Sequence, residues 1–494
     1  MMKQHVSRWA YCGLTAAALL TLTGCAGDGY DDDERFVSVV KNTQLSSPEI
    51  NDINIVASAD GKTQTISWPV VPGAGGYLFS FYDASNLEEP IVKDSLIDGC
   101  SVTVKREEDV NYRIDLRTMG NKQNNNTEAQ ETTTKLFSTF TPTFAVIPAG
   151  SNLNEWFAQN PVPEDSVGVN LNYDLEGGAD YTLSDELDFE LNAVTLRSTS
   201  KTNHAHVTLT TSSATIAFAA GFNLKYIDFD CAAQVNNKGI FVFSGTDKGT
   251  AANAIDPDAF KWTGIYVAEP VTFVNCNFDN VRGYFFWDNS KKVCFETVLV
   301  DNVLCHLAPE ANVAGGVFWT NKGGQINNLT VSNSTFYLLP DCKFDYNYFY
   351  QAGGVSAQDV HNNTTATNSV NYLNSTFYHL TWNNHQWGNY NRMQGRTYSY
   401  WVMTNCIFYD CSTSGSVPRR FLHGQAYANS PQNKTFLNNT YMKNDGTFQD
   451  PQNYDTSGTI IEEDPVFANP AAGDFHISGA TQVARRTGDP RWLP

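Results

Sequence analysis

One short motif recurs at wide intervals through the C-terminal two thirds of the chain. It combines an asparagine, a small residue and, three positions after the asparagine, an aromatic ring. The four closest copies span residues 274–278, 332–336, 373–377 and 404–408. Weaker copies begin at Asn302 and Asn438, and the spacing of the asparagines varies from 27 residues (275 to 302) to 41 residues (333 to 374). A constant motif separated by loops of variable length predicts stacked coils of chain.

Each copy follows a stretch of β-prone residues, so one coil contributes a strand, an asparagine turn and a second strand. The pattern predicts an all-β fold whose larger part, residues 141–494, is a right-handed single-stranded parallel β-helix with an N-terminal cap. Stacked coils place like side chains above one another, so we expect a structural ladder of Asn275, Asn333, Asn374 and Asn405. The alternative is ordinary hairpin turn chemistry, because asparagine tolerates left-handed backbone.

The N-terminal end carries an export pattern. Lys3 and Arg8 precede an apolar stretch of about 13 residues that closes on Cys25, which is too short for a membrane span. We expect residues 1–24 to be a lipoprotein signal peptide, Cys25 to be lipidated, and residues 25–46 to be a flexible acidic tether. The acidic run 28–34 resembles the export tag of Bacteroidetes surface lipoproteins, which implies a lipid-anchored protein of the outer membrane that faces the cell exterior.

Residues 47–140 alternate apolar and polar positions in short runs, which predicts a β-sandwich. The runs 63–68 and 71–82 resemble strands B and C of a fibronectin type III module, and residues 111–120 resemble its strand F. The resemblance implies that Trp68 and Tyr112 lie in the core and that the module is a spacer.

Charge and cysteine usage narrow the function classes. The formal net charge of -20 argues against nucleic acid as a partner, because phosphate binding needs clustered lysine and arginine. Eight of the ten cysteines lie after Cys25, without a CxxC pair, so we predict no zinc site and expect them to fill the core. Two disulfides stay open, Cys406 with Cys411 and Cys294 with Cys305.

The wider resemblance concerns the whole exported chain. Residues 169–198 resemble the first turns of pectate-lyase-like β-helices, and residues 464–477 and 488–492 resemble the closing segment of exported bacterial β-helix proteins. Together they resemble uncharacterised Bacteroidetes surface lipoproteins encoded in glycan-utilisation loci. The resemblance implies a polysaccharide partner, and contact with other proteins of a glycan-uptake complex.

Two long insertions between copies of the motif are rich in aromatic residues among polar neighbours. Exposed aromatic rings stack on the apolar faces of sugars, whereas amides and carboxylates bind the hydroxyl groups. We therefore take the following as candidate ligand-binding residues: Tyr346, Tyr348, Tyr350, Trp382, Trp387 and Tyr390. The alternative is that these rings pack on one another as loop clusters.

The leading hypothesis is a cell-surface lipoprotein that binds an extended polysaccharide and needs no cofactor. A second hypothesis is a lyase that cleaves uronic-acid glycans by β-elimination, with His385, Arg392 and Arg396 as catalytic candidates and Ca²⁺ as a conceivable aid. A hydrolase would need Asp279, Asp288 or Asp301 to converge. The pectate lyase and polygalacturonase motifs are absent from the sequence, and a structural or adhesion protein is the third hypothesis.

Overall fold

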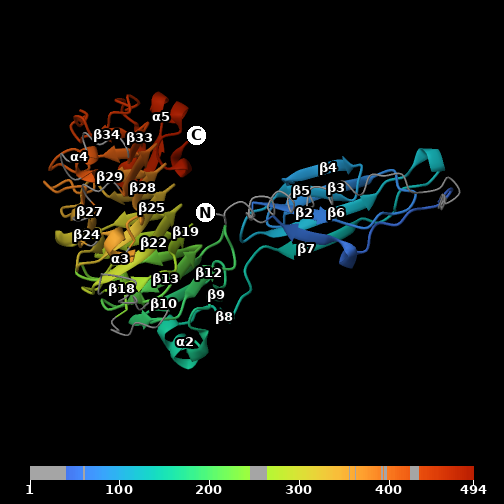
Figure 1. Ribbon diagram of the computed structural model, residues 1–494, viewed down its shortest axis with the longest axis horizontal. Coiled ribbons are helices and arrows are strands. Elements are labelled where there is room, and N and C mark those ends of the chain that lie inside the picture. Colours follow the sequence, from blue (N-terminus) through green and yellow to red (C-terminus); the bar gives the residue numbers. More distant parts are fainter. Residues whose placement is uncertain are drawn as a thin grey trace, which may run out of the picture. The chain divides into compact units, whose positions relative to one another are not determined.

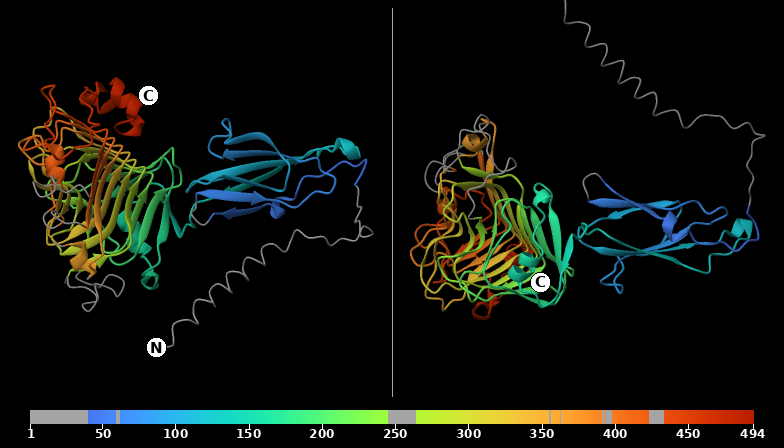
Figure 2. Two further views of the ribbon diagram at one scale, coloured as in Figure 1. Left: turned by 45° about the horizontal axis from the view of Figure 1, so that its top comes forward. Right: turned by 90° about the horizontal axis from the view of Figure 1, so that it is seen from below.

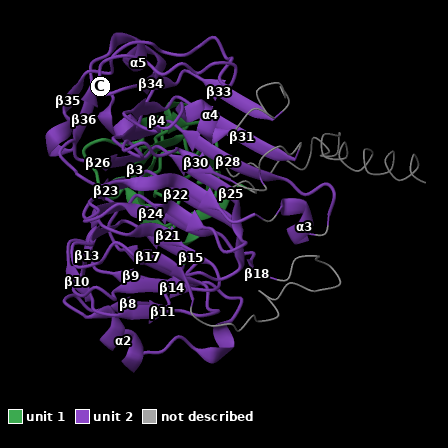
Figure 3. Cartoon of the chain, turned by 90° about the vertical axis from the view of Figure 1, so that its left-hand side faces the viewer, with its two compact units in different colours: residues 1–141 green, residues 142–494 purple. Residues whose placement is uncertain are grey.

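The chain divides into two compact units, residues 1–141 and residues 142–494 (Figures 1 and 3). The structure is a computed structural model that describes residues 40–58, 62–244, 264–354, 356–361, 363–390, 393, 398–422 and 433–494. In these ranges no helix is long and apolar enough to cross a membrane. Cys25 lies outside the described residues.

The first unit is a sandwich of two antiparallel sheets. One sheet has the order β1 (Asn54–Ala57), β2 (Thr63–Ser67), β5 (Ser101–Lys105). The other has the order β4 (Val92–Ile97), β3 (Tyr77–Asp83), β6 (Asn111–Thr118), β7 (Thr133–Ser138). Trp68 is 5% exposed and packs edge-on against Tyr77, with ring centroids 5.4 Å apart. Alternate residues of β6, including Tyr112, also point inward, as the sequence predicted.

The second unit is a parallel β-helix, whose stacked strands are visible in Figure 2. Its first sheet has nine strands, in the order β10 (Asp180–Leu183), β13 (Ala205–Leu209), β16 (Ile227–Asp230), β20 (Asn277–Val281), β23 (Leu304–Leu307), β26 (Thr335–Leu338), β29 (Thr376–Tyr378), β32 (Ile407–Tyr409), β34 (Thr440–Met442). Its second sheet has seven, in the order β11 (Glu186–Asp188), β14 (Thr215–Phe218), β17 (Gly239–Phe243), β21 (Tyr284–Trp287), β24 (Val313–Thr320), β27 (Tyr346–Ala352), β30 (Gly388–Asn389).

The third sheet of the β-helix has eleven strands. Ten follow the order β33 (Lys434–Leu437), β31 (Ser399–Thr404), β28 (Asn368–Leu373), β25 (Gln325–Ser332), β22 (Val293–Asp301), β19 (Val271–Val274), β15 (Phe222–Lys225), β12 (Val194–Ser198), β9 (Leu171–Leu175), β8 (Ala145–Ile147), and β18 (Ile265–Val267) pairs with β22. Successive coils visit the three sheets in turn, so each residue has an equivalent one coil away.

The repeated motif forms the corner between the eleven-stranded and nine-stranded sheets. Its asparagines all have left-handed backbone, with φ between 46° and 53° from Asn275 to Asn438. The amide of Asn438 donates to Asn405 and that of Asn405 donates to Asn374, both at 3.0 Å, and Asn374 donates to Asn333 at 3.4 Å. Asn302 donates to Asn275. The column has one offset, because Asn333 donates to Asp301 at 2.7 Å instead of to Asn302.

The aromatic position of the motif stacks inside the coil. Phe377 lies 4.9 Å from Phe408 and 6.3 Å from Phe336 between ring centroids, with nearly parallel planes, and Tyr441 continues the stack. The small residue of the motif is buried at the corner, as at Cys276 and Cys406. The eight cysteines of the described ranges are all free, so the two disulfides do not form in the structure.

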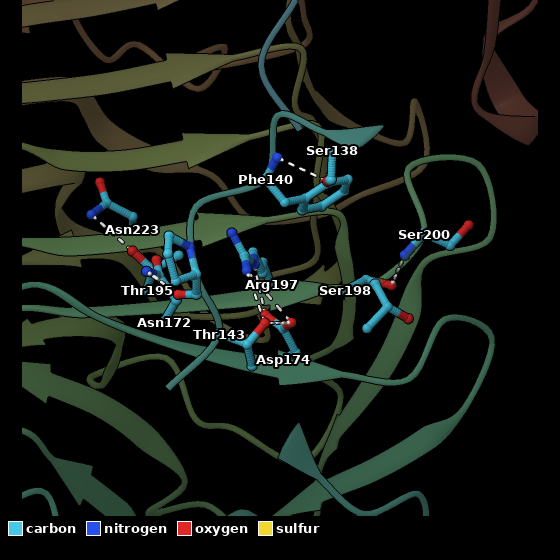
Figure 4. A network of polar contacts seen from close by, with 12 residues as sticks. Ser138, Phe140, Thr143, Asn172, Asp174, Thr195, Arg197, Ser198, Ser200 and Asn223 are labelled. Atoms are coloured by element: carbon cyan, nitrogen blue, oxygen red, sulfur yellow. Dashed lines mark hydrogen bonds and ion pairs between the residues drawn. The ribbon is translucent and has the colours of Figure 1, made fainter. Parts of the chain in front are cut away.

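A buried ion pair anchors the start of the β-helix (Figure 4). Asp174 of β9 and Arg197 of β12 are register partners, and Arg197 Nε donates to Asp174 Oδ1 at 2.6 Å. Thr143 donates to the same carboxylate, and Arg197 is 1% exposed. The short helix α2 (Leu153–Gln159) covers this end, and the Asn152 side chain caps it by accepting from the Glu155 N–H.

The other helical segments are short. They are η1 (Ile50–Asp52), η2 (Lys122–Asn124), η3 (Glu164–Ser166), α3 (Ala357–His361), α4 (Val417–Phe421), η6 (Pro470–Ala472), α5 (Ala480–Arg485) and η7 (Pro490–Trp492). The last three belong to a C-terminal segment, residues 464–494, that also contains the hairpin β35 (Phe467–Asn469) and β36 (Asp474–Ile477). This segment folds back over the nine-stranded sheet, where Phe475 packs on Tyr337 and Tyr378.

Candidate functional site

Four of the six aromatic residues predicted to bind ligand lie inside the β-helix instead. Tyr346, Tyr350, Trp387 and Tyr390 are at most 1% exposed and belong to the apolar core. The region predicted to be a loop contains strand β27, and Trp387 stacks on Phe349 at 4.6 Å inside the coil. The interpretation of these four rings as a sugar-binding surface is therefore wrong, because their faces are covered by other side chains.

The other two aromatic candidates, Tyr348 and Trp382, are half-buried. Trp382 stacks on His379 with ring centroids 4.8 Å apart and an angle of 9° between planes. Nδ1 of His379 pairs with Asp410 at 2.6 Å. Trp382 thus packs on a histidine of its own coil, which Asp410 of the next coil holds in place; this is the loop packing that the sequence left open.

The catalytic candidates do not form a described cluster. His385 Nδ1 pairs with Asp345 Oδ1 at 2.9 Å, and the other oxygen of Asp345 accepts from the Asn383 N–H at 2.9 Å. Asp345 is fully buried, and burial raises its pKa. This carboxyl group therefore holds the loop that carries His385. Arg392 and Arg396 lie outside the described residues.

The acidic candidates do not converge either. Asp279 lies on the nine-stranded sheet, Asp288 directly follows β21 of the seven-stranded sheet, and Asp301 ends β22 of the eleven-stranded sheet. Asp288 is buried, and accepts from the N–H groups of Ser290 and Lys322. Within the described ranges, no three His, Cys, Asp or Glu side chains are arranged to hold a metal ion.

The structure instead shows an open groove of about 560 Å³ on the outer face of the nine-stranded sheet. Strands β10, β13, β16, β20 and β23 form its floor, where alternate residues point outward. One outward column in register is Asp180, His206, Asp228, Asn277 and Leu304. A parallel column is Thr182, Thr208, Asp230 and Asp279, and His306 and Tyr337 lie beyond it on the next coils.

The C-terminal segment ends the groove. Beyond Tyr337 the same outer columns continue on β26, β29 and β32, but they are covered. Trp492 Nε1 donates to Thr335 Oγ1 at 2.8 Å, and Thr335 Oγ1 donates to Asp489 at 2.7 Å. The first five coils of this face are therefore open, whereas the later ones are closed by the chain itself.

Asp228 sits near the middle of the groove and is held in place on two sides. Its Oδ1 atom accepts from Asn277 Nδ2 at 2.8 Å and pairs with His204 Nδ1 at 2.7 Å. The Nε2 atom of His204 faces the Lys201 carbonyl at 3.1 Å. These contacts fix the carboxylate and leave its Oδ2 atom without a hydrogen bond from the residues that the structure describes.

Asp230 and Asp279 are neighbours on adjacent coils and share one amide. Asn280 Nδ2 donates to Asp230 Oδ1 at 3.1 Å and to Asp279 Oδ2 at 3.2 Å. His306 Nδ1 pairs with Asp279 Oδ1 at 2.5 Å, and this hydrogen bond lowers the pKa of Asp279. His306 in turn stacks on Tyr337 at 4.9 Å. The groove thus presents carboxylates, an amide, imidazoles and a stacked aromatic pair.

A signal for this groove exists in the sequence. The strands of the nine-stranded sheet read as triplets with an apolar centre between outward positions, as in 206–208, 228–230 and 277–279. The third triplet overlaps the copy of the repeated motif at residues 274–278. The position of this copy therefore fixes the register of the neighbouring triplets. Of these outward positions only Asp279 was named from the sequence, as a hydrolase candidate, because the aromatic rings of the long insertions gave the stronger signal.

Three families of unknown function match consecutive parts of the chain. DUF4992, a domain of unknown function, matches residues 3–194, DUF4957 matches residues 179–339, and DUF5123 matches residues 370–492. The first match crosses the border between the two structural units at residue 141. No curated protein matches the sequence.

Among solved structures, the chain is similar to a mutant form of a PL6 family alginate lyase. The match has 11% sequence identity and a TM-score of 0.37, and it covers 66% of this chain and 45% of that chain. The protein therefore spans under half of the length of that enzyme.

Proposed function

We propose that the protein binds an extended polysaccharide in the groove of the nine-stranded sheet. The observation that carries the proposal is the open row of outward polar side chains on successive coils, which includes Asp228, Asn277 and Asp279. Carboxylate and amide groups that are already oriented bind sugar hydroxyls without a further ordering cost. The coils repeat along the axis, so a polymer meets similar groups at regular intervals.

The charge of the groove favours a neutral glycan over a uronate. Four aspartates and two histidines line it, and its described lining contains no lysine or arginine. An uronic acid chain would bring carboxylates towards Asp228, Asp230 and Asp279, which is electrostatically unfavourable. Beta-elimination also needs a cationic group to neutralise the uronate. We therefore favour binding without cleavage in this groove.

The remaining parts of the chain suggest how the groove is displayed. In our proposal Cys25 carries a lipid anchor in the outer membrane, and the sandwich acts as a fibronectin type III-like spacer. Its three-plus-four arrangement of antiparallel strands supports this assignment. The protein would then capture glycan at the cell surface for other proteins of an uptake complex.

Affinity gel electrophoresis of the full exported chain against neutral plant and host polysaccharides tests the proposal. The double variant Asp228→Ala/Asp230→Ala should bind the retained glycan at least tenfold more weakly, because a hydrogen bond to a charged group contributes about 1.5–3 kcal/mol. The matched control is Asp445→Ala, an exposed aspartate outside the groove lining. Retention of no glycan by the wild-type protein, or unchanged binding by the double variant, would refute the proposal.

A further inference from the structure

The seven-stranded sheet carries a second outward column that differs in character from the groove. Trp287 of β21, Trp319 of β24, Gln351 of β27 and Asn389 of β30 are register partners on four successive coils. Tyr284 lies beside the two tryptophans. We call these five residues the aromatic track. All five are half-buried.

Two of the three rings of the track are nearly parallel, whereas Trp287 is tilted by 39° to Tyr284. The planes of Tyr284 and Trp319 are 14° apart and their centroids are separated by 5.9 Å. Gly315 lies directly beneath them, because a Cβ atom at this position would come within 2.6 Å of both rings. A glycine here allows the rings to approach the backbone and present one face outward.

The side-chain polar atoms of the track make no hydrogen bond with the residues that the structure describes. The indole N–H groups of Trp287 and Trp319 make no hydrogen bond there and are not buried, whereas the buried indole of Trp387 is enclosed in the core. Gln351 Oε1 is a buried acceptor without a donor. The column therefore offers two ring faces with free indole N–H donors, followed by two amide side chains, although the Oε1 atom of Gln351 is itself covered.

We propose that the aromatic track is a second contact surface for polysaccharide, on a different sheet of the coil from the groove. This inference rests on the proposed function, since it assigns another site for the same class of ligand. The coils are spaced by about 4.8 Å, so the track is a line parallel to the helix axis. A linear ligand that repeats apolar ring faces and hydroxyl groups matches its order of rings and amides.

A protein segment fits this surface less well. The track lies in the interior of a sheet, with β21 and β24 paired on both sides, so no strand can be added to it. A docked helix needs a continuous apolar groove, and two of the four positions in register are amides. Stacked pyranose rings need only the exposed faces that the track provides.

The test compares four variants in or beneath the track with a matched control. Trp287→Ala and Trp319→Ala each remove one ring, and Gly315→Ala places a methyl group where the rings lie. Tyr400→Ala is the control, because Tyr400 is 45% exposed on the eleven-stranded sheet, away from the track. Circular dichroism establishes that each variant is folded, and Trp319→Phe provides a milder variant that keeps a ring.

The probes are soluble galactomannan, xyloglucan and hydroxyethyl cellulose, measured by affinity electrophoresis and tryptophan fluorescence. We expect each alanine variant of the track to bind the retained glycan about fivefold to tenfold more weakly, Trp319→Phe to recover most of this loss, and Tyr400→Ala to match the wild type. Saturating glycan should shift the wild-type fluorescence, and this shift should shrink in Trp319→Ala.

The outcomes separate this inference from the proposed function. If folded track variants bind like the wild type while Asp228→Ala/Asp230→Ala loses binding, the track inference is wrong and the groove stands. If the track variants lose binding and the groove variant keeps it, the track stands and the groove is wrong. If the wild-type protein binds none of the three probes, the track is not a contact surface for neutral glycans.

Discussion

Replacing Asn374 tests whether the asparagine column stabilises the β-helix. Its amide donates to Asn333 at 3.4 Å and accepts from Asn405 at 3.0 Å, and its φ is 46°. The two hydrogen bonds together contribute about 1.5 kcal/mol, since one of them is long. Alanine at left-handed backbone adds a strain of about 1–2 kcal/mol. We therefore expect Asn374→Ala to lower the free energy of unfolding by about 3 kcal/mol.

Asn374→Gly separates the two causes. Glycine loses the same hydrogen bonds and avoids the strain, but it raises the entropy of the unfolded chain, which costs about 0.7 kcal/mol. The expected loss is about 2 kcal/mol, roughly 1 kcal/mol less than for alanine. Asn384 is the control, because it is exposed at a φ of 61° and its side-chain amide makes no hydrogen bond within the described ranges, while its backbone N–H donates to Thr413 Oγ1. Asn384→Ala should cost only the strain.

Urea unfolding of the full chain, followed by circular dichroism, measures these differences in the transition of the second unit. A loss below about 0.5 kcal/mol for both variants of Asn374 would show that the column adds nothing to stability. Equal losses at Asn374 and Asn384 would assign the effect to the backbone alone. Either result refutes the reasoning from the ladder.

Two further predictions concern buried charges. Arg197→Met should lower the free energy of unfolding of the β-helix by about 3–5 kcal/mol in urea, because it leaves the buried Asp174 carboxylate without its ion-pair partner. The double variant with Asp174→Leu should recover much of this loss, and no recovery would contradict an electrostatic cause. Burial raises the pKa of Asp288 to about 6, above its ordinary value of 3.8, so the folded state holds the proton more tightly. Stability should therefore fall by up to about 3 kcal/mol as pH rises from about 4 to 6 and level off above that, and Asp288→Asn should lose this component of the pH dependence; an unchanged profile would contradict the assignment.

The motif and its spacing were sufficient to predict stacked parallel coils. An asparagine with left-handed backbone, followed by a small and an aromatic residue, forms the same corner on every coil. The local backbone preference of Asn374 and Asn405 therefore agrees with the arrangement of the whole β-helix. The resemblance of residues 63–68 to a fibronectin type III strand likewise implied that Trp68 lies in the core of the sandwich, where it is 5% exposed.

The aromatic residues show where sequence reasoning failed. Trp387 stands among polar neighbours in the sequence and is buried, whereas Trp319 directly follows the apolar Val317 and Phe318 and lies on the outer face. Which side of a short strand faces the core depends on the register with the coils before and after it. A polar neighbourhood alone does not contain this information, so the predicted ligand-binding rings included core residues.

The sequence by itself determined the repeating corner, and with it the parallel β-helix, because each coil satisfies its own turn and stacks on an equivalent one. Only the tertiary structure decided which surfaces stay open. Phe475 and Trp492 return from the end of the chain to cover the coils after Tyr337, a contact between residues more than 130 positions apart (337 to 475). Such long-range closure depends on how complete surfaces fit together, and it sets the length of the groove.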